Sequence, residues 1–104
     1  MIRATTPKHS FKFPSDPQAY KEILITYQQK GKIILELKEE DLTFGEENTA
    51  FYKLSQEQTK KFNAMVPVRI QVRILDADDN AFASSIFSIN VHEVLNDEVL
   101  VDED

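Results

Sequence analysis

The most regular pattern in the chain is an alternation of apolar and polar residues over Val66–Leu75. Apolar side chains stand at every second position from Val66, and Arg69, Gln71 and Arg73 lie between them. Because successive side chains of a β-strand point to opposite faces, this alternation predicts one long strand with an apolar face and a solvated face. A solvated face disfavours a sheet buried on both sides, so the pattern indicates a strand of an antiparallel sandwich.

Shorter alternating segments on either side predict six further strands. Turn residues separate them, and the clearest breaks are Pro14–Pro17 and Gly31, where glycine accepts a positive φ at little cost. The six predicted segments are residues 9–13, 20–28, 33–37, 42–44, 50–54 and about 82–92.

The phase of each alternation predicts which residues face the core. Three apolar sets are expected there: Ile23, Ile25 and Tyr27; Ile33, Leu35 and Leu37; and Phe87, Ile89 and Val91. Aromatic side chains between the strands are assigned to the core and its edge before any binding role: Phe44, Phe51, Tyr52, Phe62 and Phe82.

One segment carries a helical signal. Ser55 and Gln58 form a capping box, in which each side chain satisfies a backbone N–H of the first turn. Glu57 lies near the positive end of the helix dipole, and Lys60 and Lys61 lie near its negative end. These residues predict a helix of two turns at most, between the fifth and sixth strands.

About seven short strands with one short helix predict an all-β protein with an immunoglobulin-like antiparallel β-sandwich. A small barrel is the alternative. A chain of 104 residues has the length of one ordinary domain, so we expect a single sandwich domain over residues 1–104, with residues 94–104 as an acidic C-terminal tail.

The charge of the chain limits its partners. A formal charge of −6 disfavours nucleic acid, because binding to a phosphate backbone depends on Lys and Arg contacts that release counterions. Residues 1–13 lack the apolar run of a signal peptide, and no segment approaches the length of a membrane span. We therefore expect no membrane partner and a chain made without an export signal.

Chemically reactive groups are few. Cysteine is absent, which excludes disulfides, thiolate nucleophiles and zinc–thiolate sites. Ser84, Ser85 and Ser88 lack the glycine-flanked turn of a nucleophile, and His9 and His92 have no spacing that fixes two metal ligands together, so polar surface roles are favoured for all five. We therefore predict no catalytic residues, no cofactor and no enzyme activity.

The acidic loop after the long strand resembles part of a calcium site. Asp76, Asp78 and Asn80 occupy the first, third and fifth positions of a calcium-binding loop. The pattern then fails, because Ala81 stands where the loop turns on glycine and Phe87 where a bidentate glutamate belongs. A solvated hairpin loop is the favoured interpretation.

Two features are candidates for binding a partner. Arg69 and Arg73 share one face of the long strand, where they either meet a partner's carboxylates or remain solvated. The tail is rich in aliphatic residues, which is unusual for a disordered end, so we expect Val94–Val101 to dock along its own sheet edge or to add a strand to a neighbouring subunit. The predicted partner-binding residues are Arg69, Arg73, Val94, Leu95, Val99 and Leu100.

Several stretches, spread over nearly the whole chain, carry a resemblance to a family. They are Met1–Pro7 with His9 and Phe11, Leu54–Thr59, Ile70–Leu75, Ala83–Ser85 and Val94–Leu100. In these stretches the chain resembles short, largely uncharacterised proteins encoded in prophages of Gram-positive gut bacteria. Such proteins are similar in size and strand pattern to immunoglobulin-like modules of phage tails and baseplates.

The resemblance implies a non-catalytic structural or assembly protein of a phage, associated with the tail or baseplate and acting through protein–protein contacts. Its partners would be other phage structural proteins and further copies of itself, and it would be found in the host cytoplasm during assembly and in the virion. A carbohydrate- or cell-surface-binding sandwich module is the alternative. The absence of tryptophan, a common stacking surface for sugars, disfavours it.

Overall fold

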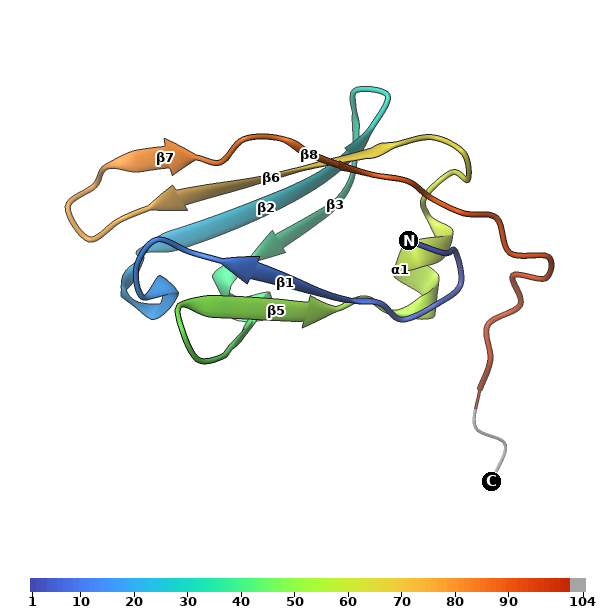
Figure 1. Cartoon of the computed structure of the whole chain (residues 1–104), viewed down its shortest axis with the longest axis horizontal. Helices are drawn as coiled ribbons and strands as arrows, with labels where there is room; N and C mark the ends of the chain where they lie inside the picture. The colour runs from blue at the N-terminus through green and yellow to red at the C-terminus, as the bar shows by residue number, and fades with distance from the viewer. Residues whose placement is uncertain (102–104) are drawn as a thin grey trace.

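Two antiparallel β-sheets packed face to face make up the body of the protein (Figure 1). The computed structural model describes residues 1–101. The smaller sheet has the strand order β1-β5-β4, and the larger has the order β3-β2-β6-β7, with β8 also pairing with β6. In chain order the elements are β1 (Lys8–Lys12), a 3₁₀ helix η1 (Pro17–Ala19), β2 (Glu22–Gln29), β3 (Lys32–Lys38), a 3₁₀ helix η2 (Glu39–Asp41), β4 (Thr43–Phe44), β5 (Thr49–Lys53), α1 (Gln56–Lys60), β6 (Val68–Leu75), β7 (Ala81–Ala83) and β8 (Phe87–Ile89).

The long alternating segment forms the central strand β6, as predicted. The strand begins one residue after Pro67, which has no N–H to donate to a neighbouring strand. Arg69 and Arg73 are exposed on its outer face. Its inner face is buried through Val68, Ile70 and Val72. The prediction of an all-β sandwich is confirmed, with eight strands in place of about seven and α1 between the fifth and sixth.

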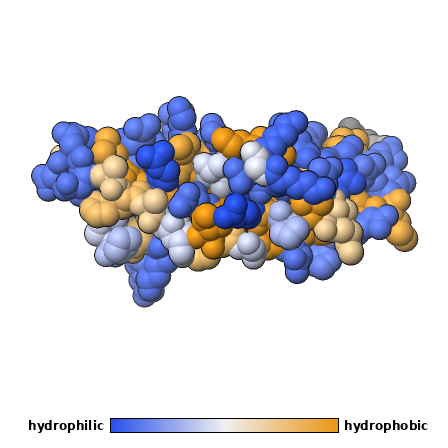
Figure 2. All heavy atoms as spheres, turned by 90° about the horizontal axis from the view of Figure 1, so that it is seen from above, coloured by the Kyte–Doolittle hydropathy of each residue, from blue (hydrophilic) through white to orange (hydrophobic). Residues whose placement is uncertain are grey.

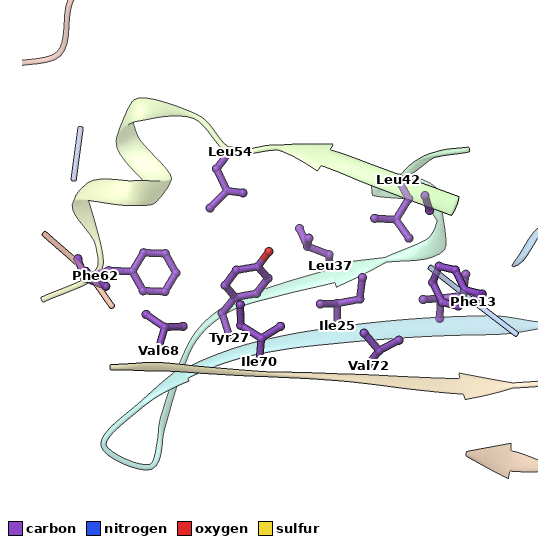
Figure 3. Close-up of a cluster of buried hydrophobic side chains, with 13 residues drawn as sticks. Phe13, Ile25, Tyr27, Leu37, Leu42, Leu54, Phe62, Val68, Ile70 and Val72 are labelled. Carbon is purple, nitrogen blue, oxygen red and sulfur yellow. The ribbon is translucent and has the colours of Figure 1, made fainter. Parts of the chain in front are cut away.

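Side chains from both sheets and from the segments on either side of α1 converge in the core (Figure 3). At its centre the ring of Tyr27, on β2, stacks on the ring of His9, on β1, with centroids 5.6 Å apart and an interplanar angle of 11°. The Tyr27 ring also meets Phe62 at 6.0 Å, so it joins the two sheets to the end of the helical segment. The buried apolar residues are Phe13, Ile23, Ile25, Tyr27, Leu37, Leu42, Ala50, Leu54, Phe62, Val68, Ile70, Val72 and Val91.

The predicted capping box is confirmed at the start of α1. The Ser55 hydroxyl accepts the Gln58 N–H at 3.1 Å, and the Gln58 side chain accepts the Ser55 N–H at 2.9 Å. Thr59, fully buried within the helix, donates to the carbonyl of Thr5 at 2.9 Å and accepts the Thr5 N–H at 3.1 Å. This five-residue helix is therefore held by tertiary contacts as well as by its cap.

The last predicted strand, over residues 82–92, is wrong as a single strand. It divides into β7 and β8, and the register against β6 changes by one residue between them, since Arg73 lies opposite Ala83 but Ile70 lies opposite Phe87. The break is stabilised by Ser84, whose hydroxyl accepts the Val72 N–H at 3.0 Å.

Two of the aromatic residues predicted in or near the core are exposed. Val91 is buried, as predicted, and Ile89 is partly buried, but Phe87 and Phe82 are 51% and 55% exposed. The extra residue at the break places Phe82 and Phe87 on the same face of the sheet, opposite Ile74 and Ile70. That face is the inner one, so these phenyl rings are exposed because no strand of the smaller sheet covers them.

The predicted core set Ile33, Leu35 and Leu37 is also only partly correct. Leu37 is buried, whereas Ile33, near the turn of the β2–β3 hairpin, is 52% exposed. The pairing of β2 with β3 shifts between Tyr27 and Gln28, so the alternation does not continue in phase to the turn.

Candidate functional site

An open cleft of about 620 Å³ lies between β1 of the smaller sheet and β7 and β8 of the larger one. We call it the edge cleft. Most of its lining is aliphatic and aromatic carbon. Its lining residues are Lys8, His9, Ser10, Phe11, Lys12, Phe13, Pro14, Ile70, Val72, Ile74, Phe82, Ala83, Ser84, Phe87 and Ile89. The exposed rings of Phe82 and Phe87 therefore belong to a concave surface.

Apolar surface is not confined to the cleft. Figure 2, which views the protein from above Figure 1, shows hydrophobic residues lying among charged ones along that face. The edge cleft differs because apolar side chains of both sheets line one hollow. Concave apolar surface of this kind is the usual location of a binding site.

One wall of the edge cleft is an unpaired strand edge. The carbonyl of Pro7 and the N–H of Phe13, at the two ends of β1, bond to the β5 side. Because backbone groups of an antiparallel strand alternate in direction, the N–H and C=O groups of Lys8, Ser10 and Lys12 point away from β5. Within residues 1–101 no backbone partner pairs with that edge, since β1 is the last strand of its sheet.

The opposite wall has the same property over a shorter length. The Ser84 N–H bonds to Val72 on β6, so the backbone groups of Ala81 and Ala83 point outward. The N-terminal residues cover this edge where the chain continues beyond β8. There the backbone N–H of His92 donates to the Met1 carbonyl at 2.7 Å, and the His92 carbonyl accepts the Arg3 N–H at 3.3 Å. The cleft is thus a slot between two strand edges, closed at one end.

The electrostatics of the slot differ from those of the whole chain. The protein carries a formal charge of −6, yet the charged residues that line the cleft are Lys8 and Lys12. The Lys8 ammonium lies 3.9 Å from the centre of the Phe51 ring, a cation–π contact that keeps it at the outer face of β1. The rim is therefore suited to a partner with negative charge.

His9 lies at the base of the cleft, where sequence analysis expected a surface histidine. A hydrogen bond of 2.6 Å joins its Nδ1 to the Tyr27 hydroxyl. Burial, followed by the positive charge of the N-terminal amine, lowers the pKa of His9 below its usual value. Burial, followed by the nearby Tyr52, raises the pKa of Tyr27. His9 is therefore partly buried between the two sheets and is not the fully solvated surface histidine that was predicted.

The predicted arginine pair does not belong to the edge cleft. Arg69 and Arg73 lie on the outer face of β6, whereas Ile70, Val72 and Ile74 of the same strand line the cleft from the inner face. Arg69 lines a shallower depression of about 510 Å³ with Lys30 and Met65. Contact of the two arginines with a partner's carboxylates stays a prediction.

The C-terminal segment contacts its own chain, but not along a sheet edge. The Arg3 guanidinium pairs with Asp97 at 3.4 Å, and the Gln56 amide bonds to both the N–H and the carbonyl of Leu100 at 2.8 and 2.9 Å. These contacts use charge and backbone. Of the aliphatic side chains, Leu95, Leu100 and Val101 are 102%, 77% and 71% exposed, whereas Val94 and Val99 are partly buried. The part of the tail from residue 102 lies outside the described residues.

The acidic loop is a hairpin turn. The Asp76 carboxylate accepts the N–H groups of Asp78 and Asn80, each at 2.9 Å, and Asp79 adopts a φ of 64°. The backbone N–H of Asn80 is the main cause of a lowered pKa for Asp76. Its oxygens thus bond to the loop's own backbone, as in an Asx turn.

Among residues 1–101 no group of three or more His, Asp or Glu side chains is placed to hold a metal ion. In that range, too, no helix has the length and hydrophobicity needed to cross a bilayer.

The strand order defines the class of protein. The order β3-β2-β6-β7 corresponds to strands C′-C-F-G of a variable-type immunoglobulin sheet, and β1-β5-β4 corresponds to strands B-E-D of the facing sheet. Ile2 bridges in parallel to His92, beside the last strand. The protein is an immunoglobulin-like β-sandwich in which no strand A lies beside β1 within the described residues. Tyr27 holds the place of the buried strand-C tryptophan, and His9 packs on it where many such domains have a disulfide.

Similarity to known proteins is found among solved structures. No protein-family model and no curated protein matches the chain. Among solved structures, the chain is similar to two of a strand-swapped dimer of mouse leukocyte-associated immunoglobulin-like receptor 1, each with 7% identity over 90% of this chain and 84% of that chain, at TM-scores of 0.47 and 0.49. It is also similar to the V domain of amphioxus IgVJ-C2, with 10% identity over 88% of this chain and 96% of that chain, at a TM-score of 0.36.

Sequence reasoning missed the edge cleft. One signal in the sequence is the spacing of two aromatic residues in the last predicted strand. Phe82 and Phe87 stand an odd number of residues apart, so they cannot share a face in a regular strand. Two exposed aromatic residues on one inner face require the register change at Ser84, and only the three-dimensional pairing shows it.

Proposed function

We propose that this protein is a non-catalytic binding module that takes up an extended segment of another polypeptide in its edge cleft, as a structural or assembly component of a phage tail or baseplate. The observation that carries the proposal is the cleft itself, with an unpaired strand edge along an apolar hollow. A segment that enters it gains main-chain hydrogen bonds from β1 and buries side chains against the phenyl rings of Phe82 and Phe87.

The chemistry of the cleft favours a polypeptide over a sugar. Sugars are recognised through many directed hydrogen bonds, whereas most of this lining is carbon. The imidazole of His9 already bonds to Tyr27, and Ser84 bonds to the backbone of Val72 and Ser85. The free hydrogen-bonding groups along β1 are spaced as a strand presents them, which matches another strand.

The phage assignment comes from the resemblance of the sequence to prophage-encoded proteins. A module of this kind suits particle assembly, because repeated subunits are joined by short segments that add a strand to a neighbour. In this proposal the partners are other structural proteins of the particle, and the protein acts in the host cytoplasm during assembly.

The test is deletion of the gene in a lysogen, followed by electron microscopy of the induced particles. We expect defective tails or baseplates after deletion and normal ones after complementation with the wild-type chain. Normal particles after deletion would contradict the phage assignment.

A matched pair of substitutions tests the cleft in the same assay. Phe87→Asp places a charge in the cleft, whereas Ile86→Asp changes an adjacent residue that is 47% exposed and outside the lining. Both side chains are largely exposed, so both variants are expected to fold, which circular dichroism checks. We expect Ile86→Asp to restore assembly and Phe87→Asp to fail. Restoration by Phe87→Asp, or glycan binding that depends on Phe87, would exclude the cleft as a polypeptide site.

A further inference from the structure

We infer that the segment received by the edge cleft is the C-terminal stretch Val94–Val101 of a second copy of this chain, added as a strand beside β1. The inference rests on the proposed function and names its partner. The protein would then join copies head to tail, each giving its tail to the next, or pair two copies by reciprocal exchange.

Charge complementarity is the first argument. Lys8 and Lys12 are the charged residues of the cleft lining, and the segment Val94–Val101 carries two acids, Asp97 and Glu98, and no basic residue. Asp97 and Glu98 are adjacent in sequence, so one of them lies on the outer face of an added strand in either phase, beside the exposed lysines of β1. The chain thus carries both a cleft with a basic rim and an acidic segment of opposite charge.

The second argument is exposed apolar surface, which is present both in the edge cleft and on the tail. Phe82 and Phe87 are 55% and 51% exposed on the inner face of the larger sheet, and Leu95 and Leu100 are 102% and 77% exposed on the tail. Burial of a side chain of this size contributes roughly 1.5–3 kcal/mol. Leu95 and Leu100 stand an odd number of residues apart, so one of them faces the cleft in either phase of an added strand. The structure therefore has an uncovered apolar cleft and exposed leucine side chains on the tail.

The dimensions of the two parts agree. The eight residues of the tail segment reach about 26 Å when extended, and the five residues of β1 span about 17 Å. The free backbone groups of Lys8, Ser10 and Lys12 accept a strand over that length.

The polar contacts that hold the tail on its own chain are few. They are the 3.4 Å ion pair between Arg3 and Asp97 and the two exposed hydrogen bonds from Gln56 to Leu100. Exposed contacts of this kind contribute little to stability. In Figure 1 the tail runs past α1 and away from the body, so it is positioned to reach another copy.

The decisive experiment mixes two full-length variants, each with one half of the interface removed. The donor-defective variant carries Leu95→Asn and Leu100→Asn, and the acceptor-defective variant carries Phe87→Asp. Sedimentation equilibrium of the wild-type chain is expected to show association that strengthens with concentration. Each variant alone is expected to associate at least about tenfold more weakly, a loss of about 1.4 kcal/mol or more. The mixture is expected to form a one-to-one complex, and Ile86→Asp is expected to behave as wild type.

An amide-exchange measurement identifies the acceptor edge. On mixing, the N–H groups of Lys8, Ser10 and Lys12 in the donor-defective variant are expected to become protected, since they gain main-chain partners. Association should also weaken with added salt, because acids and lysines meet at the rim.

A wild-type chain that stays monomeric up to millimolar concentration would overturn the inference. So would a mixture that fails to associate, or association without protection of the three β1 amides. These results leave the deletion assay in the lysogen unchanged, so failure of self-donation is distinguishable from failure of the proposed function.

Discussion

At the scale of single residues, the pair formed by His9 and Tyr27 joins the sheets. Immunoglobulin-like domains often join their sheets with a disulfide packed on a strand-C tryptophan, and this chain has neither residue type. Stacked rings 5.6 Å apart and a 2.6 Å hydrogen bond stand in the same place. This arrangement places a titratable, partly buried imidazole between the sheets.

The free energy of unfolding is therefore expected to depend on pH through His9. Burial lowers the pKa of His9, so the unfolded chain binds a proton more readily than the folded one. The contribution is fully present above the unfolded pKa of about 6.5 and is lost as the pH falls through 6.5 toward the folded pKa. Urea titrations between pH 5 and pH 7.5 should show stability increasing with pH.

A comparison of the two histidines isolates this effect. His9→Gln should remove most of the slope in that window, and His92→Gln, at an exposed position, should keep it. The lowered pKa values of Glu39 and Asp76 affect stability only at more acidic pH, because carboxyl groups titrate near 4. Equal slopes in the wild type and in His9→Gln would contradict the prediction.

At the scale of elements, β1 has one paired edge and one free edge. The paired edge bonds to β5 over five residue pairs, from Lys8 opposite Lys53 to Lys12 opposite Thr49. Edge strands of natural proteins are commonly protected by lysine, which discourages uncontrolled pairing. Lys8 and Lys12 fit that role, and in the association inferred above the same two lysines would select an acidic strand.

Hydrogen exchange of the dilute protein should reveal this edge directly. The amides of His9 and Phe11 bond to β5 and are expected to exchange at least about tenfold more slowly than those of Lys8, Ser10 and Lys12, since each 1.4 kcal/mol of opening free energy is a factor of ten. Nuclear magnetic resonance of the labelled protein at low concentration measures all five. Uniform protection along β1 would show that the edge is covered.

At the scale of the whole molecule, one apolar cluster fills the space between the sheets. It includes Phe13 near the start of the chain, Ile25 in the middle and Val91 near the end. Residues so far apart in sequence become neighbours only when both sheets are formed. This arrangement favours the single domain predicted from the length of the chain.

Unfolding is therefore expected to be a single cooperative transition. The tyrosine signal in near-ultraviolet circular dichroism and the backbone signal in the far ultraviolet should change together with temperature or urea. Ile25→Ala should lower the free energy of unfolding by about 2–5 kcal/mol, because Ile25 is fully buried. Ile33→Ala, at a position 52% exposed, should cost roughly 0.5 kcal/mol. Separate transitions for the two signals would contradict the single domain.

The sequence alone determined the features that depend on neighbours along the chain. Two-residue alternation identified β6 and the buried face of β2, since side-chain direction in a strand follows from position alone. Ser55 and Gln58 identified the start of α1, because a capping box closes within four residues.

Only the tertiary structure decided which apolar faces are covered. Phe87 and Val91 fall on the same face in the sequence pattern, yet one is 51% exposed and the other 1%. The difference depends on where the strands of the smaller sheet end, which is a property of strand pairing between distant segments. The edge cleft arises from such pairings, so the odd spacing of Phe82 and Phe87 in the sequence does not by itself reveal it.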